Sequence, residues 1–190
     1  MPSDVEFAFD YASPWSFLAN ATLSRHFGDA RITYVPVYLR GFQSFSQGVP
    51  YSPAKLSYLM RDFVRSATHA GVSYQMPSVF PINGLHALRA AVAAQRAGVF
   101  PALHDALFRA AWQQGRDVSD KATVVAIARE AGFAGVADHI DDAEIKNALR
   151  ASTDRAVARG AFGVPTFFVG DEMFWGHDRM HFAAEAARGG

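Results

Sequence analysis

The sequence predicts an α/β protein in which a helical block separates an opening βαβ unit from a closing ββα unit. Apolar residues alternate with others from Val5 to Tyr11, which indicates a strand, and Ser13-Pro14 indicates a helix start directly after it. Near the other end, residues 165–175 indicate two apolar strands joined by a short turn. Because the patterns between these units are helical, an insertion into the sheet explains the order without a long linker.

The opening unit is predicted to be a parallel βαβ unit. Serine is favoured as the N-cap of a helix, and proline at the first helical position loses no hydrogen bond. The helix that starts at Ser13-Pro14 is expected to stop at Gly28-Asp29, and residues 32–39 form a second apolar strand. A helix between two strands of one sheet connects them in parallel.

The middle of the chain combines a packed loop with a series of helices. Residues 41–53 are rich in Gly, Ser, Gln and Pro and carry three aromatic side chains, which indicates a loop that packs, with a site beneath it as the functional interpretation. A connector is expected at residues 75–83. Glycines punctuate the helices, which are predicted over residues 54–70, 84–97, 101–113, 119–131, 134–139 and 142–159.

The closing unit begins at Pro165, which can open a strand but cannot donate a hydrogen bond within one. Residues 167–169 are apolar in succession, which suits a strand covered on both faces. A turn at residues 170–172 precedes the second strand. Asp178 is then expected in the first turn of the last helix, where a carboxylate complements the helix dipole.

Composition restricts the class of protein. The chain has 190 residues, of which 50% are hydrophobic and 19% charged, which is enough for one packed domain with or without an insertion. Eighteen basic and eighteen acidic residues cancel, so no basic excess favours nucleic acid or an anionic membrane. No signal-peptide pattern and no apolar run of the ~20 residues that a membrane helix needs is found. We therefore expect a cytoplasmic protein.

The absence of cysteine restricts the chemistry. With no thiol in the chain, dithiol redox chemistry is excluded, and sulfur chemistry requires a ligand that brings its own thiol. The histidines show no metal-ligand spacing with nearby carboxylates, so no metal is expected. The sequence also has no phosphate-binding loop and no nucleophile-elbow motif.

Two stretches carry a family resemblance. These are Ser13-Pro14-Trp15-Ser16, at a strand-to-helix junction, and Val164-Pro165-Thr166. Together they resemble the thioredoxin-like fold in its disulfide-isomerase-like and kappa-class glutathione transferase branch, and most closely the 2-hydroxychromene-2-carboxylate isomerases. The resemblance covers nearly the whole chain. It implies a thioredoxin-like domain of residues 1–42 and 155–190 with a helical insertion domain of residues 43–154.

The resemblance also implies glutathione as cofactor. Ser13 is an N-cap by its own pattern, and the resemblance adds a catalytic role in which its hydroxyl donates to the thiolate of glutathione and lowers the thiol pKa. Sequence alone favours a trans bond before Pro165. The resemblance implies a cis bond, with the backbone of Val164 pairing with the cysteinyl part of glutathione. Ser16 is expected to be structural.

The remaining site residues follow in the same way. Asp178 is implied to bind the γ-glutamyl ammonium, and His177 to contribute its backbone amide, whereas helix capping is the alternative for both. Lys55 is implied to reach a ligand carboxylate, although a solvated charge is more usual at such a position. Asn83 is a further candidate contact to substrate or cofactor, with a turn residue equally favoured.

The resemblance therefore implies a glutathione-dependent isomerase that interconverts 2-hydroxychromene-2-carboxylate and trans-o-hydroxybenzylidenepyruvate, or a close analogue, in aromatic-compound catabolism. The substrate is thus expected to be a small aromatic keto acid. One alternative is a kappa-type glutathione transferase or peroxidase, and another is a non-enzymatic thioredoxin-like binding module. Whether the chain forms a homodimer is left open.

Overall fold

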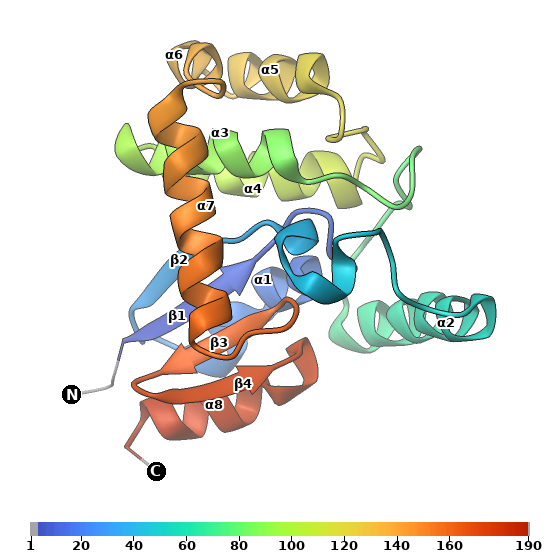
Figure 1. Cartoon of the computed structure of the whole chain (residues 1–190). Helices are drawn as coiled ribbons and strands as arrows, with labels where there is room; N and C mark the ends of the chain where they lie inside the picture. The colour runs from blue at the N-terminus through green and yellow to red at the C-terminus, as the bar shows by residue number, and fades with distance from the viewer. Residues whose placement is uncertain (1–3, 190) are drawn as a thin grey trace.

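The structure is a computed structural model that describes residues 4–189, and its centre is a four-stranded sheet in the order β2-β1-β3-β4 (Figure 1). Strand β1 (Val5–Phe9) pairs in parallel with β2 (Ile32–Pro36). On its other side β1 pairs antiparallel with β3 (Thr166–Val169), which pairs antiparallel with β4 (Glu172–Trp175). The predicted βαβ and ββα units therefore share one sheet.

The helices follow the predicted order. They are α1 (Pro14–Phe27), α2 (Pro53–Ala70), α3 (Leu85–Arg96), α4 (Phe100–Trp112), α5 (Lys121–Glu130), α6 (Ala134–Asp138), α7 (Ala143–Ala158) and α8 (Met180–Ala187). Figure 1 shows α3 to α6 together on one side of the sheet and α2 extending away from the rest. The α/β class with a helical insertion is confirmed, whereas the residue boundaries of the two proposed domains stay a prediction.

Both faces of the sheet are covered. Val5, Phe7 and Phe9 belong to the larger core, which includes residues of α1, α3, α4 and α8. Ala8, one position out of phase with them, joins a smaller core that includes Phe168 of β3 and Ala156 of α7. Because side chains alternate across a strand, the apolar run at residues 167–169 serves both cores, as its composition predicted.

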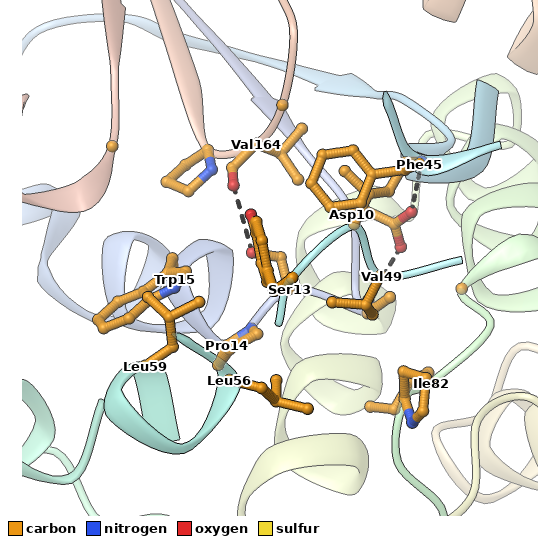
Figure 2. Close-up of a pocket in the computed structure, with 18 of the residues that line it drawn as sticks. Asp10, Ser13, Pro14, Trp15, Phe45, Val49, Leu56, Leu59, Ile82 and Val164 are labelled. Atoms are coloured by element: carbon orange, nitrogen blue, oxygen red, sulfur yellow. Dashed lines mark hydrogen bonds between the residues drawn. The ribbon is translucent and has the colours of Figure 1, made fainter. Parts of the chain in front are cut away.

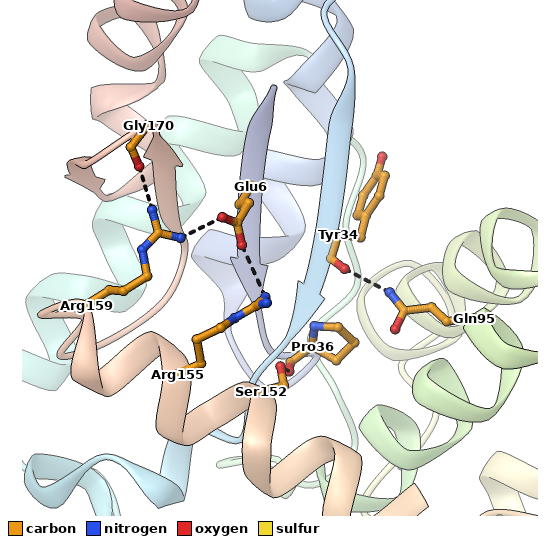
Figure 3. Close-up of polar contacts among 8 residues, drawn as sticks. All are labelled: Glu6, Tyr34, Pro36, Gln95, Ser152, Arg155, Arg159 and Gly170. Carbon is orange, nitrogen blue, oxygen red and sulfur yellow. Dashed lines mark hydrogen bonds and ion pairs between the residues drawn. The ribbon is translucent and has the colours of Figure 1, made fainter. Parts of the chain in front are cut away.

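Helix α7 is attached to the sheet by polar contacts (Figure 3). Glu6 of β1 forms ion pairs with Arg155 at 3.2 Å and with Arg159 at 2.6 Å. Arg159 also donates to the carbonyl of Gly170 at 2.7 Å, and its guanidinium lies 3.9 Å from the ring centre of Phe168. These contacts hold α7 over the β1–β3 pair.

Three predicted element boundaries near the cavity differ in the structure. The first strand ends at Phe9 rather than Tyr11, and the second at Pro36 rather than Leu39. The cause is that Leu39 N–H donates to the carboxylate of Asp10 at 2.8 Å, outside the strand ladder, and residues 39–41 form a 3-10 turn. The placement of Asp178 in the last α-helix was wrong, because His177–Arg179 form a 3-10 turn and α8 begins at Met180.

Within residues 4–189, no helix combines the length and apolar character needed to cross a membrane.

Candidate active site

A cavity of about 310 Å³ lies where the two sequence motifs meet. Its walls come from the start of α1, the loop after β2, the first half of α2, the segment before α3, and the turns that flank β3 and β4. The predicted packed loop contributes Phe45, Val49 and Tyr51. Figure 2 shows Ser13 between Trp15 and Leu59 on one side and Phe45, Val49 and Ile82 on the other.

Ser13 is the N-cap of α1 and is 4% exposed. Its Oγ accepts a hydrogen bond from Ser16 N–H at 3.1 Å, which satisfies one of the free amides at the helix start. The same hydroxyl donates to the carbonyl of Val164 at 3.4 Å, a long and therefore weak contact. The helix N-terminus gives this hydroxyl a positive surrounding potential.

The Val164-Pro165 bond is cis, as the resemblance implied. Both residues line the cavity opposite Ser13. A Cβ on the preceding residue, Gly163, would lie 3.0 Å from Nε1 of Trp175, so glycine allows Trp175 to pack closely against this turn. Phe80-Pro81 is also cis and lines the cavity.

His177 and Asp178 close one end of the cavity. The His177 ring stacks on Trp15, with ring centres 4.8 Å apart and planes inclined by 16°. Burial lowers the pKa of His177, with partial opposition from Asp178 and Asp62. Asp178 is more than half exposed and forms an ion pair with Arg179 at 3.2 Å, so its carboxylate is accessible to a ligand that competes with Arg179.

Lys55 lies in the first turn of α2, and its backbone N–H is capped by Ser52 at 3.3 Å. Its Nζ is 4.5 Å from the ring centre of Tyr51, which packs edge-on against Phe45. The ammonium is therefore positioned by an aromatic residue of the covering loop, and Lys55 lines the cavity.

Asn83 is not among the residues that line the cavity. Its Oδ1 instead accepts from the hydroxyl of Tyr38, a lining residue, at 3.1 Å, and from Leu85 N–H at 3.3 Å. The structure thus brings Ser13, Lys55, Val164, His177 and Asp178 to one cavity, and it places Asn83 behind Tyr38.

Asp10 is a wall residue that sequence reasoning missed. It is fully buried, and its two carboxylate oxygens accept from Ala12 N–H at 2.9 Å and Leu39 N–H at 2.8 Å. Burial raises the pKa of Asp10 to about 6, against the lowering effect of these amides and of Arg40. A Cβ on Gly84 would lie 1.9 Å from Asp10 Oδ1, so this contact requires glycine. The sequence signal that could have identified Asp10 is its position as a carboxylate directly after a predicted strand.

The site offers a hydroxyl at a helix N-terminus, two cationic side chains and largely apolar walls. It offers no thiol. Among residues 4–189, no group of three or more His, Cys, Asp or Glu side chains is placed to hold a metal ion.

Residues 4–188 match the family described as the DSBA-like thioredoxin domain. The chain belongs to this family. As a DSBA-like thioredoxin domain it differs from a dithiol oxidoreductase in having no cysteine.

The relatives of this DSBA-like chain include proteins named as isomerases and proteins named as glutathione transferases. A 2-hydroxychromene-2-carboxylate isomerase from Pseudomonas sp. (strain C18) is 32% identical over 98% of this chain and 90% of the relative. Glutathione S-transferase kappa 2 from Caenorhabditis elegans is 27% identical over 97% of this chain and 93% of the relative. A solved structure of 2-hydroxychromene-2-carboxylate isomerase superposes with a TM-score of 0.78 at 29% identity, covering 98% of this chain and 94% of that one.

Proposed function

We propose that this protein is a glutathione-dependent isomerase that interconverts 2-hydroxychromene-2-carboxylate and trans-o-hydroxybenzylidenepyruvate, or a close analogue. The observation that carries the proposal is the similarity, along nearly the full chain, to relatives with that isomerase name. The need for an external thiol follows from a thioredoxin-like site that has Ser13 and no cysteine.

The residues around the cavity fit glutathione. The tripeptide has two carboxylates, one ammonium, a thiol and an extended backbone, and the site has a partner for each kind of group. Lys55 is a cation for a carboxylate, Asp178 an anion for the ammonium, and the backbone of Val164 a partner for the cysteinyl amide. The backbone amide of His177 is available for the γ-glutamyl carboxylate.

When bound, glutathione supplies a thiol whose reversible addition to the conjugated carbon of the ring-opened substrate makes the double bond single and lets it rotate. Ser13 favours the ionised thiol in two ways. Its position at the start of α1 provides the positive potential of a helix N-terminus, and its hydroxyl can donate a hydrogen bond. Donation requires the hydroxyl to turn from Val164 O, and the 3.4 Å length of that contact makes this inexpensive.

The apolar walls of the cavity exclude water from the reacting thiol. Trp15, Leu59, Val49 and Ile82 surround the position of Ser13, so a substrate seated there displaces water from the thiol. Exclusion of water strengthens the hydrogen bond that Ser13 donates and the ion pair that Lys55 forms.

A kappa-type glutathione transferase is the second candidate, because relatives with that name match at 25–27% identity along nearly the whole chain. Both activities need the same glutathione site. They differ in the fate of glutathione, which a transferase consumes and an isomerase returns.

The glutathione site is tested by calorimetric titration of reduced glutathione into the pure protein. We expect saturable binding in the millimolar range or tighter. The absence of both binding heat and a thermal shift at millimolar glutathione would contradict both proposed enzymatic functions. It would favour a non-enzymatic binding module.

A further inference from the structure

The cavity has a second cation to which the proposed glutathione site assigns no task. Arg40 and Lys55 are the only Lys or Arg residues among those that line it. Within residues 4–189, Arg40 takes part in none of the ion pairs, whereas Asp178 at the other end is already paired with Arg179. A cation that lines a cavity and forms no ion pair among the described residues is a candidate ligand for a substrate anion.

The backbone that carries Arg40 is held from both sides. Tyr38 N–H donates to Thr153 Oγ1 of α7 at 3.0 Å, and Leu39 N–H donates to the buried carboxylate of Asp10 at 2.8 Å. Arg40 follows within the 3-10 turn Leu39–Gly41. The guanidinium is therefore carried by a fixed turn and not by a free loop.

The surroundings of Arg40 differ from those of the glutathione end. Phe45 and Ile82 lie across Ser13 from Trp15, whose ring stacks on His177 (Figure 2). This second end has apolar walls and two phenols, Tyr51, which packs against Phe45, and Tyr38, whose hydroxyl is oriented by Asn83 at 3.1 Å. An apolar slot that also offers a cation and a hydroxyl suits a flat aromatic carboxylate.

We infer that the Tyr38–Arg40 end of the cavity binds the acid that is converted and that Arg40 recognises its carboxylate. A guanidinium can bind a carboxylate through two parallel hydrogen bonds, which orients the acid as well as attracting it. The carboxylate of Asp10 acts electrostatically on Arg40, but the two side chains form no ion pair, and the oxygens of Asp10 accept the N–H groups of Ala12 and Leu39. The inference rests on the proposed function only for the identity of the acid.

The test uses a matched pair of ligands that do not react: benzofuran-2-carboxylate and the neutral benzofuran-2-carboxamide. Their affinities are measured by calorimetry, with and without saturating glutathione, for the wild-type protein and for Arg40→Leu, Arg40→Lys and Arg129→Leu. Arg129 is an exposed residue of α5 outside this cavity and serves as the control. Glutathione affinity is measured for every variant.

We expect Arg40→Leu to weaken binding of the carboxylate by about tenfold or more, as for loss of a charge-assisted hydrogen bond. Arg40→Lys should retain part of that affinity. Binding of the carboxamide and of glutathione should stay unchanged in both variants, and Arg129→Leu should match the wild type.

Several outcomes would overturn the inference. Equal losses for carboxylate and carboxamide would make Arg40 a structural residue, and a loss of glutathione affinity would assign it to the cofactor. Carboxylate binding that is undetectable in the wild type, or unaffected by Arg40→Leu, would also contradict it. Because neither probe reacts, an Arg40-dependent affinity in a protein that fails to isomerise would refute the proposed function and leave this inference standing.

Discussion

At the scale of single residues, Ser13 combines a structural role with a proposed chemical one. Its Oγ caps α1 through Ser16 N–H and contacts Val164 O from the opposite motif. The cap would exist in a protein of any function, so stability alone cannot reveal the chemical role. A second N-cap, Asp120 of α5, accepts from Thr123 N–H at 2.9 Å and lies outside the cavity.

We predict that Ser13→Ala raises the pKa of bound glutathione and sharply lowers turnover while glutathione stays bound. The cap loss costs ~0.5–2 kcal/mol of stability, and Asp120→Ala should cost a comparable amount without affecting turnover. The thiol pKa is obtained from the pH dependence of thiolate absorbance. A Ser13→Ala protein with the parent rate and pH profile would show that the helix amides alone activate the thiol.

The burial of His104 in α4 leads to a second prediction, which concerns the pH dependence of stability. It is 2% exposed, accepts from Tyr11 OH at 2.9 Å if neutral, and contacts Asn20 Oδ1 at 3.0 Å. Burial lowers the pKa of His104 from its usual 6.5 to about 3. As the pH falls below about 6.5, the histidine of the unfolded chain binds a proton while that of the folded chain stays neutral. The free energy of unfolding therefore decreases toward acid pH.

We expect the wild type to lose about 1.3 kcal/mol more stability than His104→Gln between pH 7 and pH 5.5. The raised pKa of Asp10 has the opposite effect on the pH dependence of stability. This effect cancels in the comparison because both proteins contain Asp10. Urea unfolding at the two pH values provides the measurement. Equal pH dependence in the two proteins would mean that His104 is protonated in the folded state.

At the scale of elements, the turn between β4 and α8 is where a predicted helix start proved to be a 3-10 turn. Asp178 is thereby placed at the cavity edge beside Arg179, with both side chains more than half exposed. An exposed ion pair of this kind contributes only ~0–1 kcal/mol to stability. The proposed role of the Asp178 carboxylate is to bind the ammonium of the ligand.

We predict that Asp178→Ala weakens glutathione binding by ~1.5–3 kcal/mol, the loss expected for a charge-assisted hydrogen bond. Asp171→Ala, in the exposed turn between β3 and β4, is the control for removal of a nearby carboxylate and should bind glutathione normally. Calorimetry and melting temperatures distinguish the effects. Unchanged affinity with a lowered melting temperature would make Asp178 a residue of the turn alone.

The elements were largely predictable because their signals are local. Ser13-Pro14 predicts the start of α1 at its own position, and the apolar run at residues 167–169 predicts a strand buried on both faces. The site was predictable only in part. Asp10 and Leu39 are 29 residues apart and Tyr38 and Asn83 are 45 apart, so their contacts depend on tertiary structure that no local pattern encodes. The family resemblance supplied Lys55 and Asp178, but Arg40 emerged only from the cavity.

At the scale of the whole molecule, the fold brings residues 151 positions apart into contact at Ser13 and Val164. One sheet holds both motifs, α7 is fixed to that sheet through Glu6, and the loop after β2 covers the resulting cavity. We propose that in this arrangement the chain provides the binding site and the electrostatic environment, and that an external thiol provides the nucleophile.

The most direct test of this account is the initial rate of conversion of 2-hydroxychromene-2-carboxylate as a function of glutathione concentration, with free glutathione measured after many turnovers. S-methylglutathione, which retains the charged groups but has no free thiol, is the matched control. We predict a rate that saturates with glutathione, no rate with the methylated control, and full recovery of glutathione. An equal rate without glutathione, or the loss of one glutathione for each turnover, would contradict the account.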